Sequence, residues 1–383
     1  MSEIRKLVGE ALSEIIESAT VGGPRIRVGL MASGSELGRE ELARGGRLAQ
    51  QQYPNIQVVM IGPITEGYED LDWIETEDCD ADIAETMEKA LQDGAIQGAV
   101  ALHYPFPMGV TTIGRVVTPA RGGDMIIASS TGTAAILRTE AMLRNAIYGI
   151  AVARSIGKKD PAVGILNIEG AHPVYRALNQ LKDKGYPVKF GQSVRKDGGA
   201  VLRGNDILAG SVDICVADTL TGNVLMKLFS SFTTGGSYEA LGWGYGPSVG
   251  EGWPYVVSII SRASGAPVIA NAISFNAAAV SGELPKVLAE EMKKAKQAGL
   301  DEVIQSLQPK QQVSAEEVNV PPAEPTDEEI HGIDVLDVED AVRELWKAGI
   351  YAESAMGCTG PVVKLPSRHM EKAREILREN NYL

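Results

Sequence analysis

Short apolar runs alternate with amphipathic stretches over most of this chain. The runs are rich in Val, Ile, Leu and Ala, and most are bounded by Gly, Ser, Thr or Pro, which is the pattern of buried strands that alternate with helices. The strands predicted in this way cover residues 25–31, 56–61, 98–103, 124–129, 162–168, 188–191, 212–217 and 255–261. The pattern therefore predicts an α/β fold on a parallel sheet, which binds its ligands beyond the carboxyl ends of the strands.

The same pattern divides the chain into four parts. Residues 1–20 resemble a charged amphipathic helix, and the α/β domain is expected over residues 21–310. Residues 311–328 contain Pro and Glu and have no helical apolar period, so they are interpreted as a linker. Residues 329–383 form a small α+β module.

This C-terminal module is expected to contain a helix over residues 338–348, a hairpin over 350–365 and a closing helix over 367–381 with Ser367 as its N-cap. A module of roughly 55 residues is marginally stable alone, so we expect it to dock on the larger domain.

Composition and charge exclude several classes of protein. The 383 residues carry a net charge of −14, which disfavours nucleic acid as a partner. No apolar run approaches the ~20 residues of a membrane span, and no signal peptide is recognised, so a cytoplasmic protein is expected. The three cysteines and four histidines have no metal-ligand spacing, and no nucleotide-binding fingerprint occurs. Neither a metal nor a nucleotide cofactor is therefore expected.

A first segment that could bind a ligand is the run of Ser129, Ser130, Thr131, Gly132 and Thr133. It stands between an apolar strand and a predicted helix, where small residues would leave backbone N–H groups open to an anion. The alternative is an ordinary helix cap.

A second segment ends the strand over residues 162–168 with Asn167 and Glu169. Both side chains could bind a ligand beyond the strand, or they could only join neighbouring loops by hydrogen bonds.

A third segment places Asp218 after a strand, followed by Thr221, Asn223 and, one helical turn further, Lys227. Carboxylates at the carboxyl end of a central strand often serve ligands, although Thr221 is also a plausible N-cap. Cys215, in the middle of the strand, is interpreted as a small core residue. A fourth segment, the glycine-rich residues 242–252, could approach a ligand closely or be a flexible turn.

Cys358 lies between Gly357 and Thr359 in the sequence GCTGP, which predicts a tight turn that displays the thiol. Exposed amides in such a turn, and the N-terminus of the helix after Ser367, would favour a reactive thiolate. His369 could be its base. A surface cysteine without a role is the alternative.

The strings GILNIEG, VLRGNDILAGSVDICVADTLTGNVLMK and IIASSTGTAAILRTEAML, together with the glycine-rich loop, resemble the phosphate acyltransferases, which convert acyl thioesters to acyl phosphates. The resemblance covers roughly residues 21–310. It implies the three-layer αβα fold shared with phosphotransacetylases and isocitrate dehydrogenases. The N-terminal string VGLMASGSELGREE lacks that family's aspartate.

The GCTGP turn extends the likeness over essentially the whole chain, to the alpha-subunit family of component C of the glycine, sarcosine and betaine reductase complexes. This resemblance implies that a selenoprotein A carries a carboxymethyl group whose reductive cleavage yields an acetyl unit. Cys358 would take that unit as a thioester, and inorganic phosphate would release acetyl phosphate, with no cofactor.

The resemblance further implies a beta subunit similar to ketoacyl synthases, and an oligomer is expected. Phosphate would bind the run from Ser129 to Thr133. The acyl pocket would be formed by the following residues: Asn167, Glu169, Asp218, Thr221, Asn223 and Lys227. Two alternatives stay open: a free-standing acyl-thioester:phosphate acyltransferase, and a non-catalytic scaffold or metabolite-binding subunit.

Overall fold

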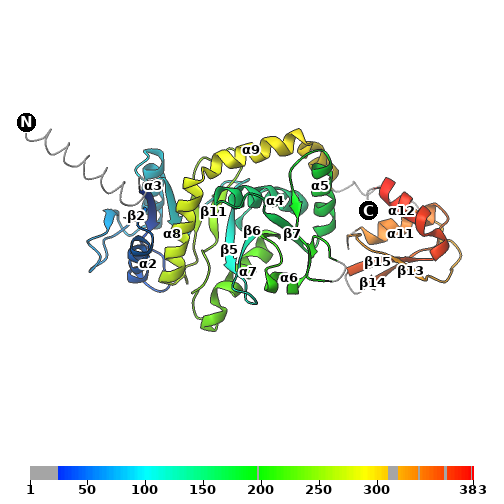
Figure 1. Cartoon of the computed structure of the whole chain (residues 1–383), viewed down its shortest axis with the longest axis horizontal. Helices are drawn as coiled ribbons and strands as arrows, with labels where there is room; N and C mark the ends of the chain where they lie inside the picture. The colour runs from blue at the N-terminus through cyan, green and yellow to red at the C-terminus, as the bar shows by residue number, and fades with distance from the viewer. Residues whose placement is uncertain (1–24, 196–197, 309–317, 335–336, 358–359, 381) are drawn as a thin grey trace, which may run out of the picture.

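The computed structural model describes residues 25–195, 198–308, 318–334, 337–357, 360–380 and 382–383. The helix expected over residues 1–20 and the start of the linker expected over 311–328 lie outside these residues. A large α/β body and a small C-terminal module lie side by side along the longest axis of the molecule (Figure 1).

A twelve-stranded sheet runs through the body in the order β3-β2-β1-β4-β12-β11-β5-β6-β10-β7-β8, with β9 beside β7. The strands are β1 (Ile26–Met31), β2 (Ile56–Ile61), β3 (Asp72–Ile74), β4 (Gly98–Ala101), β5 (Thr111–Val117), β6 (Asp124–Gly132), β7 (Ala162–Leu166), β8 (Lys189–Phe190), β9 (Val201–Leu202), β10 (Ile214–Val216), β11 (Gly246–Val249) and β12 (Val257–Ile259).

All eight strands predicted from the sequence are confirmed, but the expected parallel sheet is mixed. In the centre of the sheet, β5 is antiparallel to both β6 and β11, and β11 is antiparallel to β12. Part of the glycine-rich segment 242–252 therefore forms the strand β11 and not a loop. Gly246 permits this close packing, because a Cβ atom there would lie 1.7 Å from the carbonyl oxygen of Ile113.

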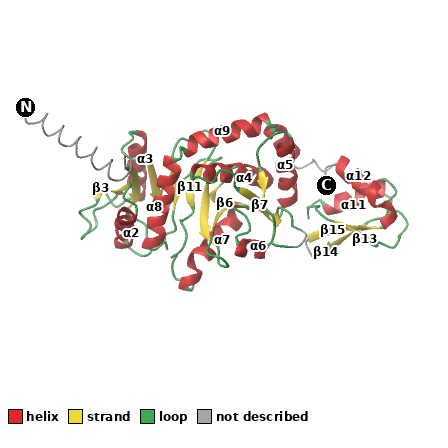
Figure 2. Ribbon diagram, viewed as in Figure 1, coloured by secondary structure: helices red, strands yellow, loops and turns green. Residues whose placement is uncertain are grey.

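Helices cover both faces of the sheet, as Figure 2 shows. They are α2 (Arg39–Gln52), α3 (Asp80–Gln92), α4 (Arg138–Ser155), α5 (Ala171–Asp183), α6 (Gly204–Ala209), α7 (Thr219–Ser231), α8 (Ala266–Ser281), α9 (Leu284–Gln297) and α10 (Leu300–Ser306), with a 3₁₀ turn η1 (Phe232–Thr234) after α7. Among the helices that the structure describes, none has the length and apolar character that crossing a bilayer requires.

The alternation of side chains along β6 shows how the three layers pack. Ile126 and Ala128 belong to the buried cluster that contains α4 and α5, whereas Ile127 belongs to the cluster that contains Met226 of α7. Successive residues of a strand point to opposite faces, so one strand contributes to both cores. The expected three-layer α/β class is confirmed.

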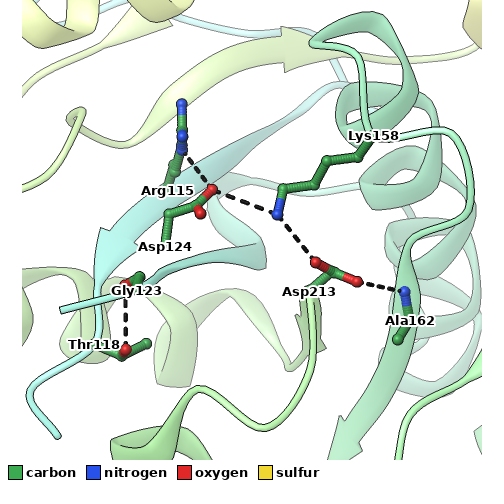
Figure 3. A network of polar contacts seen from close by, with 7 residues as sticks. All are labelled: Arg115, Thr118, Gly123, Asp124, Lys158, Ala162 and Asp213. Atoms are coloured by element: carbon green, nitrogen blue, oxygen red, sulfur yellow. Dashed lines mark hydrogen bonds and ion pairs between the residues drawn. The ribbon is translucent and has the colours of Figure 1, made fainter. Parts of the chain in front are cut away.

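Ion pairs tie the amino ends of the strands together (Figure 3). Lys158 Nζ lies 3.0 Å from Asp213 Oδ1 and 3.6 Å from Asp124 Oδ2, and Arg115 Nε lies 3.0 Å from the same Asp124 oxygen. The other oxygen of Asp213 accepts the Ala162 N–H at 2.9 Å. These ion pairs hold the amino ends of β6, β7 and β10 together. Polar side chains surround a cavity at the opposite edge of the sheet, where the strands have their carboxyl ends.

The C-terminal module has its own sheet and core. Its sheet has the order β13-β15-β14, with β13 (Glu328–Ile330), β14 (Glu353–Gly357) and β15 (Gly360–Leu365), and two helices, α11 (Val338–Lys347) and α12 (Met370–Glu379), pack on it. The predicted first helix and hairpin are confirmed, and β13 is a strand that the sequence pattern did not predict.

The expected N-cap at Ser367 is wrong. A 3₁₀ turn η2 (Ser367–His369) precedes α12, and the Ser367 amide and hydroxyl instead donate to the Asp327 carboxylate at 2.7 and 2.9 Å. These hydrogen bonds lower the pKa of Asp327. The segment before β13 is thereby attached to the start of the closing helix.

Candidate functional site at the carboxyl edge of the sheet

Three neighbouring parallel strands bring the polar segments found in the sequence to one edge. Ala128 of β6, Val216 of β10 and Ile165 of β7 form one row across these strands. Ser130, Asp218 and Asn167 each follow that row by two residues. Because adjacent strands lie about 4.8 Å apart, β6 and β7 are separated by about 10 Å at this edge. These three polar segments therefore lie at the same edge of the sheet, as expected from the sequence.

The end of β6 differs from its expected form. The sequence placed a loop at residues 129–133 directly before a helix, but β6 continues to Gly132 and α4 begins only at Arg138. The N–H groups of this run are therefore not those of a helix N-terminus, and this part of the prediction is wrong. The Thr133 N–H donates to the Val110 carbonyl at 3.1 Å.

The hydroxyl groups at this end of β6 have protein partners. Ser129 and Ser130 are fully buried. Ser130 Oγ lies 2.6 Å from the carbonyl oxygen of Tyr245 and 2.8 Å from Thr112 Oγ1, which also contacts Thr131 Oγ1 at 2.8 Å. Buried hydroxyl groups need such partners, so this cluster joins β5, β6 and the residue that precedes β11.

The start of α7 packs against the same residues of β6. Ser129 Oγ lies 2.9 Å from Thr219 Oγ1, and the Asn223 side-chain amide donates to the Ser130 carbonyl at 3.0 Å. Gly222 is required here, because a Cβ atom on it would lie 1.7 Å from the carbonyl oxygen of Ser129. The structure thus brings Ser129 and Ser130 together with Asp218 and Asn223.

Asp218, and not Thr221, is the N-cap of α7. One of its carboxylate oxygens accepts the Thr221 N–H at 3.1 Å, and the other accepts the Thr221 hydroxyl at 2.6 Å. Lys227, six residues after Thr221, is exposed, with its ammonium 5.5 Å from the centre of the Tyr245 ring. Cys215 is fully buried, and this burial raises the pKa of its thiol to about 12, which confirms its interpretation as a core residue.

Asn167 and Glu169 both follow β7, but their side chains interact with different parts of the structure. Glu169 forms an ion pair with Arg138 at the start of α4. Asn167 lines a cavity of about 430 Å³ between this edge of the sheet and the C-terminal module. The body contributes Asn167, His172, Tyr175, Arg195, Arg203 and neighbouring backbone to this cavity, and the module contributes His331, Gly332 and Pro361.

A buried carboxylate holds the two arginine-bearing segments of this cavity. Asp206, in α6, is fully buried. Its oxygens accept the Ser193 hydroxyl at 3.0 Å, the Val194 N–H at 2.6 Å and the Arg203 N–H at 2.7 Å. Charge-assisted hydrogen bonds of this kind are short and strong, so Asp206 fixes the backbone next to Arg195 and at Arg203.

The module docks on α5, directly beside the cavity. The Gly170 N–H donates to Asp334 Oδ2 at 2.8 Å, and Arg176 donates to the carbonyl oxygens of Gly332 and Tyr382 at 3.1 and 3.2 Å. Gly170 has φ +88°, which glycine adopts without strain. Burial, followed by the charge of Arg176, lowers the pKa of His172, whereas Asp334 opposes this shift.

The predicted nucleophile, Cys358, lies outside the described residues, as does Thr359. The flanking strands pair up to Gly357 and Gly360, and the next residue, Pro361, lines the cavity. His369 lies beyond the other end of β15, which spans about 17 Å at the usual strand rise. Its Nε2 accepts from Arg368 at 3.1 Å and lies 4.0 Å from Glu324, so the structure does not place it beside Gly360.

The sequence reasoning missed Arg195, Arg203, Asp206 and His172 as site residues. A usable signal was present, because Arg203 directly follows a short apolar pair and Asp206 comes three residues later, which is the spacing of a helix start. No group of three or more acidic, histidine or cysteine side chains suited to a metal occurs among the residues that the structure covers.

The chain is similar to several known proteins. The model of the "Fatty acid synthesis protein" family matches residues 26–364. The chain is 47% identical to the "Glycine/sarcosine/betaine reductase complex component C subunit alpha" of Peptoclostridium acidaminophilum, over 99% of both chains. It is 25% identical to the "Phosphate acyltransferase" of Thermotoga petrophila, over 53% of this chain and 67% of that one. A solved branched-chain phosphotransacylase from Enterococcus faecalis aligns with a TM-score of 0.48 at 15% identity, over 67% of this chain and 99% of that chain.

Proposed function

The chain belongs to the fatty acid synthesis protein family, whose members include phosphate acyltransferases, and on this premise we propose that it forms acetyl phosphate as the alpha subunit of a component C-type reductase complex. In this proposal, Cys358 carries the acetyl group as a thioester and inorganic phosphate is the acceptor. The proposed partners are a beta subunit similar to ketoacyl synthases and a selenoprotein A that carries a carboxymethyl group.

The observation that carries the proposal is the position of the module. Pro361, three residues after Cys358, lines the same cavity as Asn167 and Arg203 of the body. Hydrogen bonds from Gly170 and Arg176 to the module fix this arrangement. In the proposal, the thioester on Cys358 and an anion at the sheet edge meet in this cavity, since a transfer requires both groups to be held close together.

The transfer itself needs no cofactor. A phosphate oxygen attacks the thioester carbonyl carbon, so that a C–O bond forms and the carbonyl becomes an oxyanion. The tetrahedral intermediate then collapses, the C–S bond breaks and Cys358 leaves as a thiolate, and the proton that the attacking hydrogen phosphate loses passes to this thiolate through water. Hydrogen-bond donors at the site would stabilise the oxyanion. The covalent intermediate divides the reaction into two easier steps.

The test is the reverse half-reaction, in which the purified chain is mixed with acetyl phosphate. We expect mass spectrometry to find an added acetyl group on the peptide with Cys358, and the variant Cys358→Ala to lose both this label and arsenate-dependent hydrolysis of acetyl phosphate. Cys79→Ser is the matched control, because Cys79 is an exposed free cysteine in the body and should be dispensable.

Two other outcomes would replace the proposal. If a chain truncated after residue 328 keeps full activity, the protein is a free-standing acyltransferase and its module has no catalytic role. If phosphate binds but no acetyl group reaches Cys358 and acetyl phosphate is not consumed, the chain is a non-catalytic, metabolite-binding subunit.

A further inference from the structure

We propose that the cavity between the body and the C-terminal module binds the phosphoryl group of inorganic phosphate and of a short acyl phosphate, with Arg195 and Arg203 as its cationic groups. This inference rests on the proposed function for the identity of the anion. It assigns the phosphate to a different place from the run Ser129–Thr133 that the sequence favoured.

The first reason is the chemistry of the cavity wall. Two guanidinium groups, Arg195 and Arg203, line one cavity in a chain whose net charge is −14. A guanidinium group presents several N–H donors in a planar fork that matches the oxygen atoms of phosphate. Gly198 and Gly199 contribute backbone to the same wall, so an anion can approach main-chain atoms without obstruction by a side chain.

The second reason is the rigidity of this wall. The buried Asp206 carboxylate accepts hydrogen bonds from Ser193, Val194 and Arg203 and so fixes both arginine-bearing segments to α6. The Ser193 N–H also donates to the Gly199 carbonyl at 2.8 Å, which connects two further residues near Arg195. A site whose backbone is fixed before the ligand arrives loses less conformational entropy on binding.

The third reason is the size of the cavity and the origin of its walls. His331, Gly332 and Pro361 of the module line it together with Arg203 and Asn167 of the body, so the site is complete only when the module is docked. Its volume of about 430 Å³ falls within the usual range of about 300–1,000 Å³ for small-molecule sites, so it has room for a phosphoryl group and a short acyl chain.

The run at the end of β6 lacks these properties. Ser129 and Ser130 are fully buried, and their hydroxyl groups are bonded to Thr219, Thr112 and Tyr245 of the protein itself. A phosphate bound there would have to displace these partners. The cavity that Arg195 and Arg203 line already has room for a ligand.

The experiment measures binding of inorganic phosphate and, separately, of acetyl phosphate to the full-length chain by calorimetry. Arg203→Gln and Arg195→Gln should each raise the dissociation constant about 10- to 100-fold, the usual effect of losing a charged hydrogen-bond donor to an anion. Arg203→Lys should recover part of the affinity. Arg121→Gln is the matched control, because Arg121 is exposed on the turn between β5 and β6, and it should bind as the unchanged protein does.

Unchanged phosphate affinity in both Arg203→Gln and Arg195→Gln overturns the inference, and so does a loss of affinity in Thr133→Ala that the arginine variants do not share. The backbone N–H of Arg203, which binds Asp206, is kept in all of these variants, and thermal unfolding verifies that they are folded.

Failure of the inference and failure of the proposed function give different results. If Cys358 is acetylated but Arg203→Gln binds phosphate normally, only the assignment of the cavity is wrong. If Arg203→Gln loses phosphate affinity but Cys358 is never acetylated, the cavity is an anion site and the thioester mechanism is wrong.

Discussion

Two regions of the same sheet edge, the end of β6 and the segments around Asp206, use their polar residues in opposite ways. At the end of β6, Ser129 and Ser130 are fully buried and bonded to neighbouring strands and to α7. Around Asp206, the buried group is the carboxylate, and the arginines that it positions line a cavity. The hydroxyl-rich end of β6 therefore supports the structure of the sheet, and the arginines that line the cavity lie three strands away, around β9.

The comparison shows why the hydrogen-bond partners of a residue identify a ligand-binding site better than the type of residue does. Small hydroxyl residues and glycine suit an anion site, but they also suit a closely packed strand. A buried Asp whose donors come from two separate segments has one clear consequence: both segments are held rigidly. Rigidity of the supporting residues is what a binding site requires, so the second region is the better candidate.

The largest effect should come from removing the carboxylate that supports the arginine segments. We expect Asp206→Ala to lower the free energy of unfolding by about 2–4 kcal/mol, because the Ser193, Val194 and Arg203 donors lose their acceptor. Phosphate affinity should fall as well, since Arg195 and Arg203 lose their fixed backbone. Urea unfolding and calorimetry with phosphate measure the two effects.

A buried carboxylate elsewhere gives the matched control for this variant. Glu291 in α9 is 1% exposed and accepts from Tyr186 at 3.1 Å and Lys294 at 2.7 Å. Glu291→Ala should also destabilise the chain but leave phosphate affinity intact under conditions where it is folded. If both variants lose stability and neither loses affinity, Asp206 is only a structural residue.

A smaller effect is expected at the end of β6. Ser130→Ala should cost about 1–2 kcal/mol of unfolding free energy, because the carbonyl oxygen of Tyr245 loses a buried hydrogen-bond donor at 2.6 Å. Thr133→Ala, at an exposed position of the same segment, should cost less than about 0.5 kcal/mol.

Neither variant at the end of β6 should weaken phosphate binding. Urea unfolding combined with phosphate titration of both proteins measures the difference. A folded Ser130→Ala protein with at least tenfold weaker phosphate binding would contradict the comparison and return the anion site to β6.

Much of the fold was predictable, because strands that are buried on both faces appear in the sequence as apolar runs. The strands β5 (TTIGRVV) and β11 (GPSV) were missed because polar residues or glycine interrupt their apolar runs. They pair with each other in the centre of the sheet, an interaction between residues far apart in the chain that a local sequence pattern does not contain.

The candidate site was predictable in part. Asp218, Asn167 and Ser130 follow neighbouring strands, so their common edge follows from the α/β pattern alone. The cavity does not follow from it, because its walls come from β7, the segments held by Asp206 and a module that docks through Asp334. His369 was associated with Cys358 although it lies beyond the opposite end of β15 from Gly360, a separation that the length of the predicted hairpin already implied.

The smallest expected effect concerns the side of the cavity that faces the module, where His172 is half-buried. Its burial, and then the charge of Arg176, lower its pKa below the ordinary 6.5, against the opposing charge of Asp334. The unfolded chain therefore takes up a proton at this residue before the folded chain does. Stability from His172 is complete above about pH 6.5 and falls as the pH decreases toward the folded-state pKa.

His172→Gln removes this titration, so its unfolding free energy should decrease less than that of the unchanged protein between about pH 7.5 and about pH 5.5. Urea unfolding at the two pH values measures the difference. His103→Gln is the control, because His103 is exposed in the other half of the sheet and should show the same pH dependence as the unchanged protein. The β6 variants Ser130→Ala and Thr133→Ala should also keep that dependence, since the replaced groups do not titrate. An equal loss of stability in His172→Gln and the unchanged protein would mean that protonation of His172 does not oppose folding, and the loss of stability in acid would then have to come from other residues.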